Sequence, residues 1–183
     1  MSEIRDVLEF WLAPAHRPMW FKKEPAFDDA VRRRFEAVHE LAAAGRLAAW
    51  QNTPQGSLAL LLCLDQFPRN MYRGTPRAFA TDEKARLVAD WAVDRGFDLH
   101  FKDEQQRLFF YLPFEHSENL DDQHRAVELC RQRCVGDPEI LRYAILHRDV
   151  IEKFGRFPHR NAILGRPCTP EEEEYLKQPG AGF

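Results

Sequence analysis

Two short phrases of the sequence combine groups that can bind an anion. They occupy residues 67–70 (FPRN) and 157–161 (FPHRN), and each follows a helical pattern. A proline there is expected to stop the helix, so that a guanidinium and a carboxamide are presented from its exit. Guanidinium groups bind carboxylates and phosphates in a bidentate manner, so we expect the phrases to meet at one polar site. The candidate ligand-binding residues here are Arg69, Asn70, Arg73, Arg156, His159, Arg160 and Asn161.

A second cluster lies between two predicted helices, at residues 113–118 (PFEHSE). His116 has Glu115 and Glu118 close to it in the sequence, and nearby negative charge raises a histidine pKa and favours the imidazolium form. That form suits a general acid or an anion ligand, so His116 and Glu115 are catalytic candidates and Glu118 is a ligand-binding candidate. The plainer alternative is that Ser117 or Glu118 only caps the following helix.

Two further polar residues interrupt apolar helical stripes. His147 stands in the stripe of residues 138–154, and Gln123 stands in that of residues 119–134. Taken alone, a core histidine bonded to a backbone carbonyl is the more common case. Because neighbouring helices each turn one hydrogen-bonding residue inward, we expect a shared polar site. His147 is therefore a catalytic candidate, and Gln123 a ligand-binding one.

Asp65 and Gln66 end the most apolar helical segment of the chain, just before Arg69. A carboxylate at a buried helix end is costly unless a cation lies nearby. Pairing of Asp65 with Arg69 or Arg160 would be a structural explanation for these charges. A ligand-binding role for these arginines has equal weight, and Asp65 and Gln66 are ligand-binding candidates beside them.

Other kinds of site are not indicated. The histidines and Glu118 lack the H-x-x-x-H and H-E-x-x-H spacings of metal sites, and Ser117 lacks a G-x-S-x-G setting. The four cysteines form neither a C-x-x-C motif nor a secreted framework. We expect them to be reduced, buried and structural, and we expect no metal and no cofactor.

The composition indicates one domain, spanning residues 1–183. The chain is 44% hydrophobic with a net charge of −3, so it lacks the positive field that sequence-independent nucleic-acid binding uses. Its start is acidic rather than basic, and its longest apolar run, residues 58–64, is too short to span a bilayer. We expect a cytoplasmic protein with no nucleic-acid or membrane partner.

Helix signals recur along the chain and predict an all-α fold of about seven helices. Apolar residues have helical spacing in residues 27–41, and the caps Thr53, Thr81 and Thr169 open later helices. The only short candidate strand, residues 99–101, is too small to build a sheet. The expected core includes Leu60, Leu61, Leu64, Ile140, Ala144 and Ile151.

Three long phrases, residues 64–82 (LDQFPRNMYRGTPRAFATD), 112–118 (LPFEHSE) and 147–166 (HRDVIEKFGRFPHRNAILGR), resemble the bacterial family known as domain of unknown function 924. The resemblance covers nearly the whole chain, including EFW at 9–11 and TPEEEEYL at 169–176. It implies a tetratricopeptide-like fold of antiparallel helical hairpins and no established biochemical activity.

Three functions stay open at this point. The first is a pocket protein, such as a hydrolase or another acid/base enzyme, that acts on a small anionic ligand. The second is a tetratricopeptide-like module that binds a peptide or protein partner, which rests on fold analogy alone. In the third, the polar cluster only fixes helix packing. If the protein is an acid/base enzyme, Arg69, Arg160 and Asn161 would orient the anion, and His116 or His147 would transfer the proton.

Overall fold

The structure, a computed structural model, describes residues 2–182, which contain helices and loops and no strand. The all-α prediction is therefore confirmed. The expected number of about seven helices is not confirmed, because short helices occupy the connections between the longer ones. The helices are α1 (Ser2–Trp11), α2 (Pro25–Ala43), α3 (Pro54–Leu61), α4 (Phe67–Met71), α5 (Asp82–Asp94), α6 (Glu104–Leu108), α7 (Leu112–Glu115), α8 (Leu120–Arg133), α9 (Pro138–Phe154) and α10 (Pro170–Leu176).

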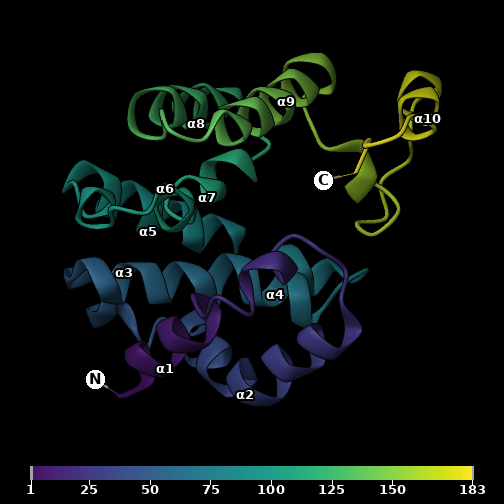
Figure 1. Ribbon diagram of the computed structural model, residues 1–183. Coiled ribbons are helices and arrows are strands. Elements are labelled where there is room, and N and C mark those ends of the chain that lie inside the picture. Colours follow the sequence, from purple (N-terminus) through teal and green to yellow (C-terminus); the bar gives the residue numbers. More distant parts are fainter. Residues whose placement is uncertain (1, 183) are drawn as a thin grey trace.

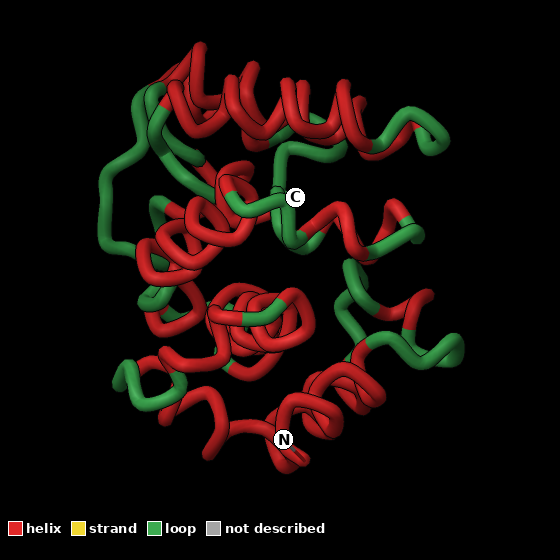
Figure 2. The backbone as a smooth tube through the Cα atoms, turned by 90° about the vertical axis from the view of Figure 1, so that its left-hand side faces the viewer, coloured by secondary structure: helices red, strands yellow, loops and turns green. Residues whose placement is uncertain are grey.

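The helices are stacked in layers that follow the order of the chain. In Figure 1, α1 and α2 lie at the bottom, α3 and α4 above them, then α5 to α7, and α8 and α9 at the top. Successive layers touch, since α2 packs on α4, α3 on α5, and α7 on α8. Figure 2 shows the same stack from the side, with loops joining the helices. This layout fits a single domain.

One hydrophobic core runs through these layers, from Val7 in α1 to Ala144 in α9. A smaller cluster, formed by Val150, Ile151 and Phe157, lies toward α10. The predicted core is confirmed, because all six of its residues are buried. Removing such side chains from water supplies roughly 1.5–3 kcal/mol each, which is the main force that holds the layers together.

The helix that leads into the first phrase does not stop at Pro68. α3 passes into a π-helical turn, η3 (Leu62–Gln66), which continues into α4. A proline ring clashes with the carbonyl four residues earlier and cannot donate to it, but the wider π turn accommodates the ring. The Phe67 amide donates instead to the Leu62 carbonyl. The Leu64 carbonyl, four residues before Pro68, accepts the Thr81 hydroxyl at 2.5 Å.

The second phrase also differs from the expected proline stop. α9 ends at Gly155, which has a φ of 68° and donates its amide to the Ile151 carbonyl. Only glycine adopts this left-handed conformation without cost. Pro158 then opens a short 3-10 helix, η6 (Pro158–Arg160). In neither phrase, therefore, does the proline end the preceding helix. Pro68 lies within a continuous helical path, and Pro158 opens η6 after α9 has already ended.

The helix after the PFEHSE segment is capped by neither of the two expected residues. Asn119 caps α8, because its side-chain oxygen accepts the backbone amides of Asp121 and Asp122. The Ser117 hydroxyl supports this cap by accepting the Asn119 amide at 3.2 Å. Glu118 has different partners, described below. The carboxamide of Asn119 reaches the first turn with less strain than a longer glutamate would.

The cysteines of the chain are all free. Cys63, Cys130 and Cys134 are buried, and burial raises the pKa of each thiol, so they stay neutral and unreactive. Cys168 is only partly buried, which corrects the expectation that all four would be inside. It lies in the loop before α10 and not in a helical stripe.

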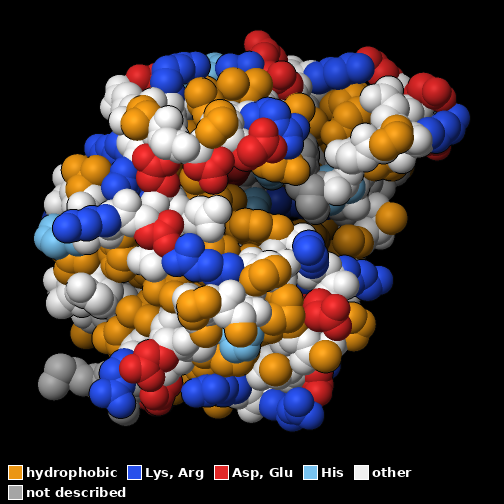
Figure 3. Space-filling model, viewed as in Figure 1, with side chains coloured by type: hydrophobic (Ala, Val, Ile, Leu, Met, Phe, Trp, Pro, Cys, Tyr) orange, Lys and Arg blue, Asp and Glu red, His pale blue; other side chains and the backbone are white. Residues whose placement is uncertain are grey.

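The surface mixes charges of both signs. On the face drawn in Figure 3, acidic and basic side chains are interspersed among apolar ones. Within residues 2–182, no helix combines the length and apolar character that crossing a bilayer requires.

Candidate functional site

The arginines of the two phrases meet at one carboxylate. Arg69 donates to both oxygens of Asp82, at 2.8 and 2.9 Å, and a guanidinium nitrogen of Arg160 lies 3.5 Å from Asp82 Oδ2. Asp82 is the first residue of α5, where the helix dipole favours a negative charge. The expected convergence of the phrases is thus confirmed for their arginines.

The guanidinium of Arg69 is bound by two carboxylates and a backbone carbonyl of the protein. Besides Asp82, it lies 3.1 Å from Asp65 Oδ1 and donates to the Asp65 carbonyl at 2.7 Å. Gln66 donates to the other oxygen of Asp65 at 2.6 Å. Burial opposes ionisation of Asp65, but Arg69 and then His116 overcome it and hold the pKa of this carboxyl below its usual range. The structural pairing of Asp65 with Arg69 is therefore present, and Asp65 is a carboxylate.

Arg160 is less well neutralised. Its side chain is 8% exposed, and its guanidinium lies 4.6 Å from the ring centre of Phe79 and 4.5 Å from that of Phe157. Its Nε is buried and has no hydrogen-bond partner among the described residues. Burial, and then Arg69, lower the pKa of Arg160 to about 10, with Asp82 opposing. At neutral pH it is a buried cation, and Asp82, its nearest carboxylate among the described residues, is already bound by Arg69.

His116 is held in one orientation by Asp65. Its Nδ1 lies 2.8 Å from Asp65 Oδ1. Because that oxygen belongs to a carboxylate, Nδ1 must be the donor, and in the neutral ring Nε2 is left as an acceptor. Nε2 makes no hydrogen bond with any residue that the structure describes.

The expected imidazolium form of His116 is wrong. Burial, and then Arg69, lower the pKa of His116 below its usual value and outweigh the opposing effect of Asp65. The neighbouring carboxyl groups of Glu115 and Glu118 do not reverse this, because each has turned toward other partners. His116 is thus a neutral base at pH 7.

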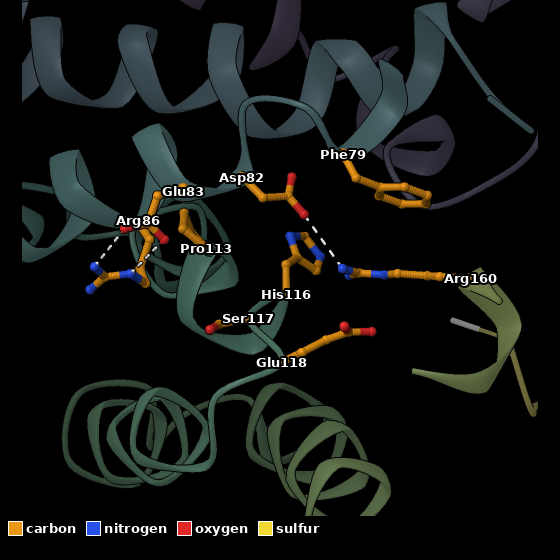
Figure 4. Close-up of a pocket in the computed structure, with 9 residues that line it drawn as sticks. All are labelled: Phe79, Asp82, Glu83, Arg86, Pro113, His116, Ser117, Glu118 and Arg160. Carbon is orange, nitrogen blue, oxygen red and sulfur yellow. Dashed lines mark hydrogen bonds and ion pairs between the residues drawn. The ribbon is translucent and has the colours of Figure 1, made fainter. Parts of the chain in front are cut away.

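A pocket of about 280 Å³ opens beside these groups. Figure 4 shows His116 between Asp82 and Glu118, with Arg160 reaching toward them from η6 on the opposite side. The walls come from separate elements, namely η4 (Pro76–Phe79), the start of α5, the end of α7 and η6. The lining residues are Phe79, Asp82, Glu83, Arg86, Pro113, His116, Ser117, Glu118 and Arg160.

Glu118 connects this pocket to the C-terminal segment. Its two oxygens accept Arg166 at 2.6 and 2.9 Å, and Oε1 also accepts the Phe157 amide at 2.8 Å. Arg166, and then the amide of Phe157, overcome burial and lower the pKa of Glu118. A carboxylate here therefore fixes the second phrase against α7 and still faces the pocket.

Glu115 and His147 lie behind the pocket and do not line it. His147 Nδ1 is 2.8 Å from the Tyr143 carbonyl and 3.5 Å from Glu115 Oε2. Burial raises the pKa of Glu115 to about 8, while burial and then His116 lower that of His147 to about 3. Both groups are therefore neutral at pH 7, and the carbonyl bond matches the core-histidine alternative.

Gln123 serves the backbone and not the pocket. Its amide donates to the carbonyls of Phe114, Glu115 and Ser117 at 3.3, 2.6 and 2.7 Å. These bonds hold the turn that carries His116. Gln123 was predicted to bind a ligand, but it does not line the pocket. It positions the turn that carries His116 instead.

The remaining polar residues of the second phrase brace the C-terminal segment. Asn161 accepts Arg166 Nε at 3.0 Å and lies 3.3 Å from Glu172 Oε2, and Arg156 binds both oxygens of Glu172 at 2.6 and 2.8 Å. His159 is adjacent, and burial, then Arg160, lower its pKa to about 4. None of the three candidates Asn161, Arg156 and His159 lines the pocket.

Asn70 and Arg73 lie at a different place. Asn70 donates to Asp28 at 2.7 Å, and Arg73 donates to the same carboxylate at 2.6 Å. Asp28 belongs to the first turn of α2, so the helix dipole and these donors together satisfy it. The first phrase therefore directs its asparagine away from the pocket that its arginine supports.

Sequence reasoning missed several groups at the pocket. Asp82 and Glu83 are recognisable as the acidic first turn of a helix, but nothing in the sequence indicates that Asp82 would collect two arginines. Arg86, Phe79 and Arg166 have no local signal at all. Among residues 2–182 no group of three or more histidine, cysteine, aspartate or glutamate residues is placed to hold a metal ion.

Comparisons with known proteins agree with the resemblance. The family model described as "Bacterial protein of unknown function (DUF924)" matches residues 7–180. The structure of the protein of unknown function ATU0120 from Agrobacterium tumefaciens is 45% identical to this chain, with a TM-score of 0.89, and the match covers 97% of this chain and 98% of that one. No curated protein matches. The chain therefore belongs to the DUF924 family of bacterial proteins.

Proposed function

We propose that the pocket binds a small molecule through an anionic group and that His116 acts there as a general base. The observation that carries this proposal is Arg160, a cation with an 8% exposed side chain. Among residues 2–182 its Nε has no hydrogen-bond partner, and no carboxylate lies closer to it than 3.5 Å. A buried charge that is poorly paired is costly. An anion in the pocket would remove that cost, and Arg160 is positioned to receive one.

The state of His116 supports a role as proton acceptor. Asp65 holds the Nδ1 proton, which leaves Nε2 unprotonated on a side chain that lines the pocket. An aspartate that fixes the tautomer of a histidine in this way also stabilises the imidazolium that forms when the base takes a proton. Hydrolysis by an activated water and proton abstraction from a bound substrate both use such a base.

Thermal melting tests the binding part. Phosphate, sulfate, acetate and longer carboxylates should be screened against wild type, Arg160→Gln and the control Arg131→Gln, which alters an exposed pair on α8. A ligand that binds the folded state raises the melting temperature by mass action. At least one anion should shift wild type and the control but not Arg160→Gln. No shift in wild type, or one that survives loss of Arg160, would contradict the proposal.

Nitrogen NMR of the histidine rings tests the base. His116 should show the Nδ1-protonated tautomer at pH 7 and titrate below the ordinary histidine pKa. A ring protonated on Nε2, or on both nitrogens at pH 7, would exclude it as a proton acceptor.

The peptide-binding alternative, like the tetratricopeptide-like hairpin arrangement, stays a prediction. A peptide groove needs an extended concave surface with repeated side-chain motifs. The pocket around Arg160 is instead assembled from four unlike segments, which favours a small ligand.

A further inference from the structure

We infer that the ligand of this pocket is a zwitterion of amino-acid type, with an ammonium group held by Glu118 in addition to the anionic group held by Arg160. This inference rests on the proposed function, because it concerns the same pocket. It adds the class of ligand and the residue that selects it.

The charge balance of the walls carries the first step. The pocket is lined by the guanidinium groups of Arg86 and Arg160 and by the carboxylates of Asp82, Glu83 and Glu118, while His116 is neutral. Their ion-pair partners add the guanidinium groups of Arg69 and Arg166 and the carboxylates of Asp65 and Asp122, so five carboxylates face four guanidinium groups. A dianion such as a phosphate monoester would meet net repulsion in these walls, whereas a ligand that adds one positive group would balance them.

Of the carboxylates at the pocket, Glu118 is better placed than Asp82 to accept an ammonium group. Asp82 is bound on both oxygens by Arg69 and also faces Arg160. Glu118 Oε1 accepts two donors, but within the described part of the chain Oε2 accepts Arg166 alone, and the side chain is 27% exposed. A carboxylate oxygen can accept about two hydrogen bonds, so Oε2 can take an ammonium proton without releasing Arg166.

Figure 4 shows the Glu118 carboxylate and the guanidinium end of Arg160 on the same side of the His116 ring, toward η6. A ligand that bound both groups would therefore lie beside that ring. Its apolar part would face Phe79, which lines the same pocket.

The volume limits the size of the ligand. At about 30 Å³ per water molecule in the liquid, the pocket of about 280 Å³ corresponds to roughly nine waters. A ligand with about that number of non-hydrogen atoms fits, which is the size of a single amino acid or a small dipeptide. Larger peptides would have to extend through the open side.

The test uses pairs of compounds that differ only in the ammonium group. L-Leucine is compared with 4-methylpentanoate, and glycylglycine with N-acetylglycine, by calorimetric titration of the full chain. In wild type, the zwitterion of at least one pair should bind at least tenfold more tightly than its partner. This ratio needs no variant, so poor folding of a mutant leaves it intact.

Two variants then assign the groups. Glu118→Gln should remove the preference for the ammonium compound while the plain carboxylate still binds. Glu139→Gln, which alters a carboxylate outside the pocket with a 61% exposed side chain, should keep the preference. Arg160→Gln should weaken both members of a pair.

The outcomes separate this inference from the function on which it rests. Equal affinity within both pairs, or a preference that survives Glu118→Gln, would overturn the zwitterion while anion binding through Arg160 stands. If neither member of either pair binds, and the inorganic anions of the melting screen do not bind either, the proposed function itself is wrong.

Discussion

Arg69 and Arg160 occupy matching places in the phrases 67–70 and 157–161, yet their surroundings differ. Arg69 makes close contacts with Asp65 and Asp82, at 2.7 to 3.1 Å. Among the described residues, Arg160 has one carboxylate in ion-pair contact, Asp82 at 3.5 Å, and its Nε has no hydrogen-bond partner. Arg69 therefore stabilises the fold, whereas Arg160 is the arginine that we propose binds a ligand.

The local backbone explains the difference. Arg69 follows Asp65 by four residues on a continuous helical path, a spacing that brings such side chains together. Arg160 belongs to a 3-10 turn and lies between two phenyl rings. The carboxylate on its other side, Glu118, is already bound by Arg166. Identical residue types thus acquire different functions from the partners that tertiary packing supplies.

The largest expected effect is on stability when Arg69 is removed. Arg69→Ala leaves the buried Asp65 and the partly buried Asp82 without their main cation, and breaking a buried ion pair typically costs about 3–5 kcal/mol. Arg160→Ala should cost about 1 kcal/mol, since it removes a poorly paired charge and some ring contact. Urea denaturation of both variants measures the difference. Equal decreases in the free energy of unfolding would mean that the two arginines contribute equally to stability.

The buried carboxyl groups extend the comparison. Asp65 has a cation beside it and its pKa is lowered, whereas burial raises that of Glu115 from 4.5 to about 8. Folded Glu115 therefore holds its proton more tightly than the unfolded chain does, so its contribution to stability falls as the pH rises from about 4.5 to 8.

Glu115→Gln, which keeps the shape of the protonated acid, should remove that loss. At pH 9 the variant should be more stable than wild type by up to roughly 5 kcal/mol, and the two should converge toward pH 5. Denaturant titrations across this range check it, with the exposed Glu152→Gln as control. If the difference between wild type and Glu115→Gln does not depend on pH, Glu115 is ionised in the fold.

Much of this architecture was predictable from the sequence, because helix periodicity and caps depend on near neighbours. The buried residues Leu61 and Ile151 and the cap Thr169 are examples. The path of the chain at Pro68 was not predictable from the sequence. It depends on a π turn that accommodates the proline ring and on the Thr81 hydroxyl, which donates to the Leu64 carbonyl. Likewise, the neutral state of His116 depends on burial and on Arg69, which sequence neighbours do not reveal.

The asparagines give the next largest effect. Asn161 is fully buried and contacts two charged groups, Arg166 and Glu172, while Asn70 contacts Asp28 alone. A hydrogen bond to a charged group contributes about 1.5–3 kcal/mol, and a buried group left without its partner adds a further cost. Asn161→Ala should therefore destabilise the protein about twice as much as Asn70→Ala in urea. If Asn70→Ala were the more destabilising change, the hydrogen bonds of Asn161 would contribute less to stability than those of Asn70.

The smallest effect concerns how the first phrase tolerates its proline. In a regular helix, the Leu64 carbonyl would accept the amide of residue 68, but residue 68 is a proline and has no N–H. The Thr81 hydroxyl donates to this carbonyl instead. Thr81→Val should cost about 1 kcal/mol in wild type. In Pro68→Ala, the new amide can approach that carbonyl, so the same change should cost less, with a coupling of about 0.5–1 kcal/mol in a double-mutant cycle. Additive effects would show that the hydroxyl does not replace the amide, and the π turn alone would then account for the unbroken helix at the first phrase.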